Sequence, residues 1–501
     1  MRPNPRRRAR RLAPGLVALL VLAFPAGARP AHAQQPTYDV VLAGGRVMDP
    51  ESGLDAVRDV GILGGKVAAI SETPLKGKTR LDAKGLVVAP GFIDMHEHGQ
   101  HALAYSYQVR DGVTTSLELE IGVPDIDAFY GEREGKTVVN FGATVSHPGA
   151  RIAALHDPST SILPTGDAAR RNATPEEEAE ILRRIEHGLE RGALGVGLGL
   201  QYTPGASREE VLEVFRTAAH HAGAPIFVHL RYMGLEEPTN SLTALQEMIG
   251  DAQVSGAPLH VVHIHSSGLK ATPVLLGMVA GAREHGLDVT TEAYPYDAGE
   301  TLIQSALFDE GWQKVLGITY GDLEWPKTNE RLTAESFARY RKEGGEVILH
   351  FIPQDAVQAA ITSPLTAIAS DGGLEPDGTG HPRATGTYSR VLGRFVREQK
   401  ALDLMTALRK MTLMPAQRLE KRDPAMKDKG RVRVGADADI TVFDPATVED
   451  RSTYGHPLAP SAGIRFVLVN GVPVVVDGKL KEGVFPGKPV RAPVEGVKAT
   501  Q

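Results

Sequence analysis

The sequence predicts an α/β fold: a (β/α)8 TIM barrel with a small composite β-sandwich domain formed by both ends of the chain. Three observations predict this fold. Eight short apolar runs recur between residues 87 and 373, helical segments separate several of them, and further β-type runs stand before and after this region. Eight βα repeats are typical of a closed barrel, and a doubly wound open sheet is the alternative.

Residues 1–33 precede this fold and have the order of a secretory signal peptide. Six arginines lie among the first eleven residues, a mostly apolar run spans residues 12–24, and small residues lead to Ala33. The apolar run is short for a membrane span, so we expect cleavage near Ala33 and no stable membrane anchor. The protein is therefore expected to be exported, either periplasmic or secreted. Arg10 and Arg11 also permit a twin-arginine signal, so the route stays open between Sec and Tat.

The mature chain is expected to be acidic, and it has no cysteine. The net charge of the whole chain is −6, and removing the seven arginines of residues 1–33 leaves −13. This charge argues against nucleic acid as a partner. Without cysteine there are no disulfides and no thiolate ligands, so any zinc must be bound by histidine and carboxylate side chains.

The β-sandwich is predicted from two sets of strand-like runs. Residues 34–88 include VVLAGGRVMD and AVRDVGILGGKVAAI, and residues 426–490 include ADITVFDP, GIRFVLVNG and VPVVVDGKL. Their alternation of apolar and polar residues is typical of half-buried antiparallel strands. Two separate hairpin lobes are the alternative, but they would leave more apolar surface exposed. Residues 491–501 are expected to form a flexible tail.

Residues 89–425 are expected to form the barrel. The strand runs are VVAPGFIDMH, TTSLELE, NFGATVSH, GALGVGLGLQY, PIFVHLR, LHVVHIHS, DVTTEAYPY and LTAIASDGG. The clearest helix runs from Thr174 to Arg191, because Thr174 can cap it, glutamates fill its first turn and its apolar residues share one face. The long segment before the eighth run contains EVILHFIP, which predicts an inserted strand or a lid element.

Metal-binding side chains stand at the ends of four of these runs. His96 and His98 close the first run, two residues apart, so both can face one ion. His229 ends the fifth run, His263 the sixth and Asp371 the eighth. In a TIM barrel the carboxyl ends of the strands form the face that carries the active site. Imidazoles with a hard carboxylate favour zinc, one ion or two, and other divalent transition metals also fit.

Two of these positions have competitors. His265 shares a strand face with His263, but it lies beyond the expected strand end and is interpreted as a loop residue. Glu118 and Glu120 share one face of the second run, where a carboxylate inside a barrel needs a cation. Glu120 lies nearer the strand end and is the expected ligand, and Glu118 would then form a buried salt bridge.

Longer motifs carry a resemblance to a known family. PGFIDMHEH, GVTTSLELE, FVHLR, HVVHIHSSG, AIASDGG and GRVRVGADADITVFDP resemble the amidohydrolase superfamily over nearly the whole mature chain. NATPEEEAEILRRIEHGLERGALGVGLGLQYTPG, TEAYPYDAG and GHPRATGTYSRVLG resemble its N-acyl-D-amino-acid deacylases, also called D-aminoacylases. The resemblance implies zinc at His96, His98, His229 and His263, with Asp371 as the acid/base residue.

The chain departs from that family at one ligand position. The family usually places a cysteine ligand after the second strand, whereas the matching stretch here is LELEIGV, so a carboxylate, expected to be Glu120, must substitute. The cyclic-amide branch, with hydantoinases and dihydroorotases, tends to carry a carboxylated lysine at the end of the fourth strand. The fourth run here has no lysine, which weakens the cyclic-amide interpretation.

The expected activity is hydrolysis of a linear amide, the deacylation of a small N-acyl-(D-)amino acid. Metal-activated water would attack the carbonyl, and Asp371 would pass a proton to the departing amine. The candidates that would bind the substrate carboxylate are Arg383, His381, Tyr202, Tyr294 and Tyr296. Arg383 is the first choice because a guanidinium pairs bidentately with a carboxylate. Its structural alternatives are a helix cap or an ion pair with Asp377.

Three other functions stay open at this stage. They are a cyclic amide hydrolase, a dipeptidase for D-residue or isoaspartyl dipeptides, and a non-catalytic binding protein on the same barrel. The sequence leaves undecided the side chain and acyl group preferred, the stereochemistry, the number of metals and the oligomeric state.

Overall fold

The computed structural model describes residues 37–494. The predicted signal peptide, residues 1–33, lies outside the described residues. No helix of the described chain is long and apolar enough to cross a membrane.

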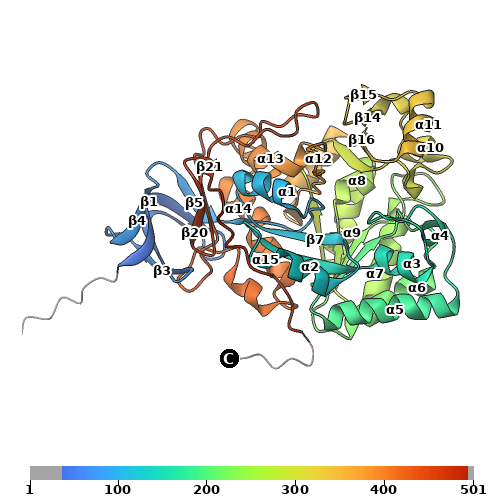
Figure 1. The fold of residues 1–501 in the computed structure, drawn as a ribbon, viewed down its shortest axis with the longest axis horizontal. Coiled ribbons are helices and arrows are strands. Elements are labelled where there is room, and N and C mark those ends of the chain that lie inside the picture. Colours follow the sequence, from blue (N-terminus) through green and yellow to red (C-terminus); the bar gives the residue numbers. More distant parts are fainter. Residues whose placement is uncertain (1–36, 495–501) are drawn as a thin grey trace, which may run out of the picture. The chain divides into compact units, whose positions relative to one another are not determined.

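The central sheet is the predicted barrel. Its eight strands are all parallel, and neighbours in the sheet follow the chain order from β6 to β12 and then β17 (Figure 1). The strands are β6 (Phe92–Asp94), β7 (Val113–Val123), β8 (Asn140–Ser146), β9 (Val196–Gly199), β10 (Ile226–His229), β11 (Leu259–Val261), β12 (Val289–Ala293) and β17 (Thr366–Ile368). At the two edges of this sheet, Ser370 N donates to the Asp94 side chain at 3.0 Å and Glu97 forms an isolated β-bridge with Gly372, so the barrel is nearly closed.

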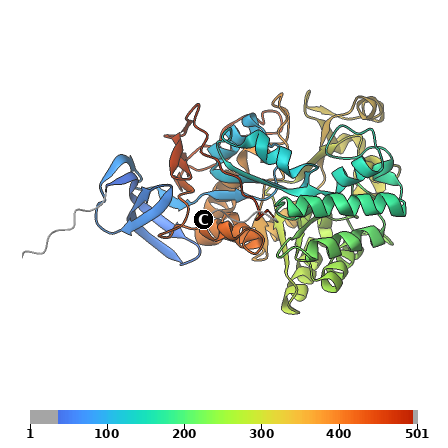
Figure 2. The same cartoon turned by 60° about the horizontal axis from the view of Figure 1, so that its bottom comes forward.

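The helices of the barrel follow its strands in sequence, the last three after β17, and lie around the strands in space (Figures 1 and 2). They are α1 (Ala102–Gln108), α2 (Ile126–Arg133), α3 (His147–Ala154), α4 (Asp167–Arg170), α5 (Pro175–Glu190), α6 (Arg208–Ala219), α7 (Ser241–Ser255), α8 (Ile264–Gly268), α9 (Thr272–Glu284), α12 (Gln354–Thr362), α13 (Arg383–Arg390), α14 (Leu404–Met411) and α15 (Leu413–Leu419). Helix α5 is the helix expected at 174–191, and Thr174 and Glu177 form a capping box at its start. Ile181, Ile185 and Leu189 on its inner face are fully buried.

A β-rich domain built from both ends of the chain adjoins the barrel, as predicted. Its nine strands are β1 (Tyr38–Asp49), β2 (Leu54–Leu63), β3 (Lys66–Ser71), β4 (Gly77–Asp82), β5 (Val87–Pro90), β18 (Ile440–Phe443), β19 (Ile464–Val469), β20 (Val472–Val476) and β21 (Lys479–Leu480). The two halves join where β18 pairs antiparallel with β5. All nine strands are connected by hydrogen bonds, because β1 pairs with β2 along one edge and with both β4 and β5 along the other.

The first strand run divides in a way that the sequence analysis did not predict. The run VVAPGFIDMH was expected to be one barrel strand, but residues 87–90 form β5 of the β-rich domain and residues 92–94 form β6 of the barrel. Gly91 lies between them, and a Cβ there would meet Thr114 Oγ1 at 2.2 Å. The chain can therefore change sheets at Gly91 only because this residue has no side chain.

The segment between β12 and β17 forms an additional small sheet, which confirms the predicted insertion. Its strands are β13 (Ala298–Leu302), β14 (Leu323–Trp325), β15 (Glu330–Arg331) and β16 (Glu346–His350), and it also contains α10 (Trp312–Leu316) and α11 (Ala334–Glu343). The EVILHFIP motif supplies β16. The insertion has its own apolar cluster, in which Trp325 stacks on Tyr340 with ring centroids 4.1 Å apart.

The predicted flexible tail begins too early, because residues 491 and 492 are packed. Val490 and Ala492 are 1% and 2% exposed, and Val490 N donates to Phe141 O at 2.7 Å. Arg491 forms an ion pair with Asp127 of α2. The segment after the β-rich domain therefore runs back along the barrel, at the amino-terminal end of β8.

Candidate metal centre

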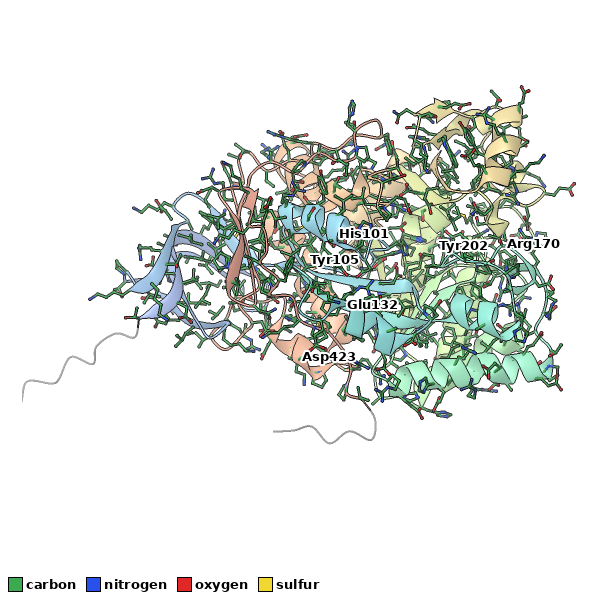
Figure 3. All side chains as sticks on the ribbon, in the orientation of Figure 1. His101, Tyr105, Glu132, Arg170, Tyr202 and Asp423 are labelled. Atoms are coloured by element: carbon green, nitrogen blue, oxygen red, sulfur yellow. The ribbon has the colours of Figure 1, made fainter. Side chains whose placement is uncertain are left out.

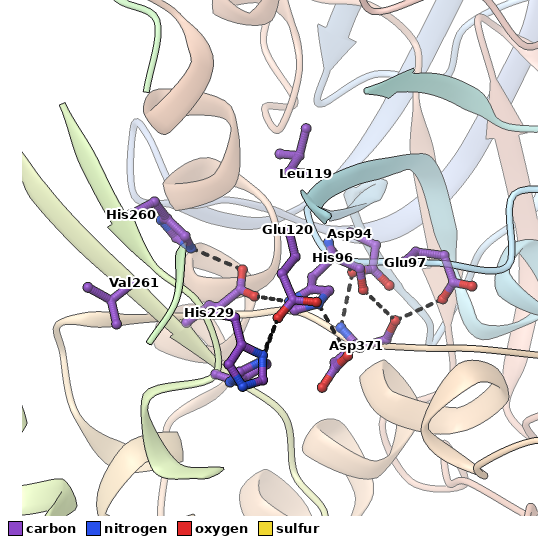
Figure 4. A network of polar contacts seen from close by, with 12 residues as sticks. Asp94, His96, Glu97, Leu119, Glu120, His229, His260, Val261 and Asp371 are labelled. Atoms are coloured by element: carbon purple, nitrogen blue, oxygen red, sulfur yellow. Dashed lines mark hydrogen bonds and ion pairs between the residues drawn. The ribbon is translucent and has the colours of Figure 1, made fainter. Parts of the chain in front are cut away.

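The barrel brings the sequence-predicted metal ligands together at the carboxyl ends of its strands. His96 and His98 follow β6, Glu120 lies on β7, and His229 is the last residue of β10. His263 follows β11 and Asp371 follows β17. These side chains come from five different strands, and Figure 4 shows polar contacts of His96, Glu120, His229 and Asp371 from close by.

Four donor atoms converge in a first group, which consists of His96 Nε2, His98 Nε2, Glu120 Oε2 and Asp371 Oδ1. His96 Nε2 lies 3.2 Å from His98 Nε2, 3.1 Å from Glu120 Oε2 and 3.2 Å from Asp371 Oδ1. His98 Nε2 lies 3.2 Å from Glu120 Oε2 and 3.5 Å from Asp371 Oδ1. A tetrahedral zinc with bonds of about 2.0–2.1 Å separates its ligands by about 3.3–3.4 Å. The group therefore has the dimensions of one tetrahedral site.

A second donor group shares Glu120 with the first. His229 Nδ1 lies 2.7 Å from Glu120 Oε1, and His263 Nε2 lies 2.9 Å from the same oxygen. The Glu120 side chain is 3% exposed, and its two oxygens face different groups. The two groups that could hold a metal ion therefore have Glu120 in common.

The charge state of Glu120 suits this role. Burial raises the pKa of its carboxyl group, but the adjacent His96 and the hydrogen bond from His229 outweigh burial and hold the pKa well below its usual value. The carboxylate is therefore ionised, which is the form that binds a cation.

Carboxylates behind the donor groups orient the histidines. Glu118 Oε2 lies 2.7 Å from His98 Nδ1, and Glu292 Oε1 lies 2.6 Å from His96 Nδ1. The other oxygen of Glu118 accepts the backbone N–H groups of residues 121 and 122. The geometry therefore separates Glu118 from Glu120: only Glu120 belongs to the donor groups, and Glu118 fixes the ring of a donor.

Glu292 and Ser266 are site residues that the sequence analysis missed. Ser266 Oγ lies 2.8 Å from His263 Nδ1, on the side of the ring opposite Glu120. Glu292 lies within the apolar run DVTTEAYPY and is 1% exposed. The signal that singled out Glu118, a carboxylate inside a strand run, could also have found Glu292.

His265 does not join either group, as expected, but it lies in the short helix α8 and not in a loop. Its ring is fully buried, packs edge-on against Tyr294 with centroids 4.3 Å apart, and has no hydrogen-bond partner among residues 37–494. His263 instead reaches Glu120 from an uncommon backbone conformation, with φ of 26°. Asp371 also has a positive φ, of 52°. Such conformations in residues other than glycine are typical of functional sites, where the surrounding structure holds them.

Replacing Glu118 with glutamine should weaken metal binding without abolishing it. The amide can still accept the backbone hydrogen bonds, but it has no charge with which to orient and polarise His98. Metal affinity should fall about 10- to 100-fold, as is typical for residues that orient a ligand. Titration with a competing chelator measures this affinity. An affinity equal to that of the wild-type protein would contradict the orienting role.

A cavity of about 440 Å³ opens beside the donor groups. Glu120, His229, His263 and Asp371 lie in its wall together with three of the predicted substrate-binding residues, Tyr202, Tyr294 and Arg383. His101 also lines the cavity and is labelled in Figure 3, as is Tyr202. The cavity therefore reaches the donor groups and is large enough to admit a small molecule.

Arg383 is the most notable cation of this cavity. Its side chain is 2% exposed, its Nη1 lies 2.8 Å from Asp371 Oδ2, and its guanidinium carbon lies 4.6 Å from the centre of the Tyr294 ring. Arg383 Nε has no hydrogen-bond partner among the described residues. Asp377, the alternative partner considered from the sequence, instead lies 3.6 Å from Lys327.

Two of the predicted substrate-binding residues lie outside the cavity wall. His381 is fully buried, its Nδ1 accepts the N–H of Arg383 at 3.0 Å, and its ring packs edge-on against Tyr296. The Tyr296 hydroxyl is directed to Pro382 O, at 3.4 Å. Both residues support the start of α13 and neither lines the cavity, so their binding of substrate stays a prediction. Sequence proximity to the motif GHPR placed them near the site but could not decide which way they face.

Comparisons with known proteins agree with this geometry. A family model described as "Amidohydrolase family" matches residues 80–377 and 364–475. An N-acyl-D-glutamate deacylase and a D-aminoacylase from Alcaligenes xylosoxydans xylosoxydans are 31% and 30% identical to the chain. These alignments cover 88% and 87% of the chain and 94% of each relative. A dihydroorotase from Syntrophus aciditrophicus (strain SB) matches at 24% identity, over 81% of the chain and 89% of that relative.

A solved structure shows the same fold. It is an N-acyl-D-glutamate deacylase from Bordetella bronchiseptica, complexed with zinc and a phosphonate inhibitor described as a mimic of the tetrahedral reaction intermediate. The alignment has a TM-score of 0.76 and 26% sequence identity, and it covers 91% of this chain and all of the other.

Proposed function

Because the chain belongs to the amidohydrolase family, we propose that it is a metal-dependent hydrolase of linear amides that removes the acyl group from N-acyl-D-amino acids. The observation that carries this proposal is the pair of donor groups bridged by Glu120, beside a cavity that also contains a buried arginine. An N-acyl amino acid offers both an amide for the donor groups and a carboxylate for the arginine.

The donor set fits zinc, as one ion or two. His96, His98, Glu120 and Asp371 would hold one ion, and Glu120, His229 and His263 would hold the other. Histidine with carboxylate is a common zinc ligand set, and other divalent transition metals can occupy such sites. When bound, zinc supplies Lewis acidity, which acidifies water and polarises a carbonyl group.

Asp371 is proposed as the acid/base residue. Its Oδ1 faces the donor group, and its Oδ2 faces Arg383. Burial raises the pKa of Asp371, but Arg383 and His96 outweigh burial and hold the pKa well below its usual value. The ionised carboxylate can accept a proton from the attacking water and deliver it to the amine nitrogen as the amide bond breaks.

Arg383 is proposed to bind the substrate carboxylate. Its Nε has no partner among the described residues, and a buried guanidinium favours a planar, bidentate anion. Tyr202 and Tyr294 lie in the same wall and can add hydroxyl donors. The carboxylate would thereby position the amide against the donor groups.

Replacing Arg383 with methionine should separate this binding role from a merely structural one. kcat/KM for an N-acyl-D-amino acid should fall by about 10- to 100-fold more than kcat/KM for the matching amide without a carboxylate, because only the first substrate loses a charge-assisted hydrogen bond. Steady-state kinetics on the two substrates provides the comparison. Equal losses on both would assign Arg383 to the support of Asp371 alone.

The proposed function is tested with zinc-loaded protein and a panel of amides. N-acetyl-D-leucine should be hydrolysed faster than N-acetyl-L-leucine, a hydantoin or a dihydroorotate. Rapid hydrolysis of the cyclic amides alone would overturn the proposal. The non-catalytic alternative predicts no hydrolysis of any compound and a substoichiometric metal content.

A structural observation weakens the hypothesis that the protein hydrolyses cyclic amides. Strand β9, which the fourth run forms, has the sequence VGLG and no lysine, and the carboxylate shared by the two donor groups belongs to Glu120 of β7 instead. A dipeptidase remains the second candidate, because an amino-acid carboxylate and an adjacent amide are common to dipeptides and N-acyl amino acids.

We also propose that the protein is exported to the periplasm or secreted after cleavage near Ala33. The proposal rests on the order of charged, apolar and small residues in 1–33. Mass spectrometry of the protein from the periplasmic fraction should give a mature chain that begins near residue 34. Full-length protein confined to the cytosol would contradict it.

A further inference from the structure

Three carboxylates outside the donor groups line the same cavity. Glu300 lies on β13, Glu346 begins β16, and Glu375 follows Asp371 by four residues. In the pairing of β13 with β16, Leu302 lies opposite Glu346 and Glu300 lies opposite Ile348. Glu300 and Glu346 therefore share one face of the inserted sheet as diagonal neighbours.

No lysine or arginine of the described chain contacts these carboxylates, although Arg383 lies near enough to lower the pKa of Glu300 and Glu346 in part. None of the three forms an ion pair within residues 37–494, and Arg383 is the only lysine or arginine in the cavity wall. Glu300 Oε2 accepts the backbone N–H of His381 at 3.2 Å, whereas its Oε1 is buried and has no hydrogen-bond partner among the same residues. A buried carboxylate oxygen without a hydrogen-bond partner lowers the stability of the fold, so Glu300 Oε1 is an acceptor that a ligand in the cavity could use.

The local electrostatics agree with an excess of negative charge. Burial, together with the neighbouring Glu375, raises the pKa of Glu346 to about 7. Burial and the neighbouring Glu346 raise the pKa of Glu300 well above its usual value. A bound cation beside these groups would relieve both effects.

The rest of the wall suits a long side chain. Apolar side chains of Leu163, Met233, Leu302, Leu349 and Phe351 line the cavity with the carboxylates. Methylene groups can pack against such residues while a charged end reaches a carboxylate. Arg383 is 2% exposed and its Nε has no hydrogen-bond partner among the described residues, so it can bind one anion in the same cavity.

We propose that the cavity selects substrates that carry a cationic group, an ammonium or a guanidinium, in addition to the α-carboxylate, and that Glu300 and Glu346 bind this cation. The proposal rests on the proposed function and names its substrate class. An acidic side chain is disfavoured, because Arg383 would be taken by the α-carboxylate and a second carboxylate would face Glu300 and Glu346. The cation can belong to the amino-acid side chain or to the acyl part, as in a dipeptide with a free amino group.

Matched substrates distinguish these two sources. N-acetyl-D-lysine and N-acetyl-D-norleucine differ by an ammonium on the side chain, and glycyl-D-leucine and N-acetyl-D-leucine differ by an ammonium on the acyl part. In one of the two pairs, the cationic member should have a kcat/KM at least about 10-fold higher, since charge-assisted hydrogen bonds are the strong ones. N-acetyl-D-glutamate should be the poorest substrate of the set.

Variants of Glu300 and Glu346 test whether these two residues cause the preference for a cationic substrate. Glu300→Gln and Glu346→Gln should each lower the ratio of kcat/KM between the cationic and the neutral member of the favoured pair, by about 10- to 100-fold. Glu343→Gln provides the matched control, because Glu343 is an exposed residue of α11, outside the cavity wall. Its ratio should equal that of the wild-type protein. Unchanged ratios in both cavity variants would overturn the proposal.

Binding gives a readout that does not depend on turnover. Calorimetry of the same five compounds on the Asp371→Asn variant, and of D-lysine and D-glutamate on the wild-type protein, should rank a cationic compound first and the glutamate compounds last. Glutamate compounds that bind as tightly as the cationic ones would overturn the charge preference. If none of the amides is cleaved, the proposed function fails, and the order of binding still decides the charge preference.

Discussion

Replacing Asp371 with asparagine is expected to lower kcat for N-acyl-D-amino acids by on the order of 10³-fold, within the range for loss of a general acid/base. Asparagine keeps an oxygen where Asp371 Oδ1 lies, 3.2 Å from His96 Nε2, but it cannot accept a proton from water at neutral pH. Proton delivery to the departing amine should therefore fail while the donor group stays assembled. Steady-state kinetics and the metal content of the same preparation measure the two effects.

The metal content separates this result from a loss of structure. A variant that retains the wild-type stoichiometry of zinc and its melting temperature, yet turns over slowly, supports the acid/base role. If Asp371→Asn loses zinc in parallel with activity, the carboxylate acts mainly as a ligand. Activity within about threefold of the wild-type value would rule out both roles.

Replacing Glu120 with alanine is expected to disassemble the centre. Both oxygens of this carboxylate are used, Oε1 at 2.7 Å from His229 and Oε2 at 3.1 Å from His96. Without it, the histidines of the two groups lose their shared negative charge. Zinc bound per chain should fall below one after dialysis, and kcat/KM should drop by more than about 100-fold, the upper range for losing a residue that only orients a ligand.

Two further substitutions test whether negative charge is the decisive property. Glu120→Cys supplies a thiolate, which can bind zinc, and should retain more zinc than Glu120→Gln, which supplies a neutral amide. Glu118→Gln is the matched control, since Glu118 lies two residues earlier on the same strand and contacts only the far side of His98. Full zinc content in Glu120→Ala would show that the bridge is dispensable.

The strand-end residues were predictable because their signal is local. A short apolar run predicts a barrel strand, and the residue that ends it must lie at the face where all eight parallel strands end. His96, His98, His229, His263 and Asp371 satisfy this rule, and the structure brings their donor atoms together. The same reasoning selected Glu120 over Glu118 from its place along the strand.

Other features depend on contacts between distant segments. The change of sheets at Gly91 follows from the approach of Thr114, and the packing of Ala492 follows from a hydrogen bond to Gly192. His381 and Tyr296 lie in a motif of the right kind, but their rings turn toward α13 and not into the cavity. No spacing along the chain encodes such orientations.

By itself, the sequence determined the barrel, the β-rich domain shared by both termini, and the set of side chains available for metal binding without cysteine. The tertiary structure alone decided that the two oxygens of Glu120 serve two donor groups, and that Glu300 and Glu346 face the same cavity as Arg383. The physical reason is that hydrophobic periodicity and composition determine the secondary structure of one segment at a time. The sharing of one carboxylate by two donor groups depends instead on ångström-scale distances between strands that are far apart in the chain.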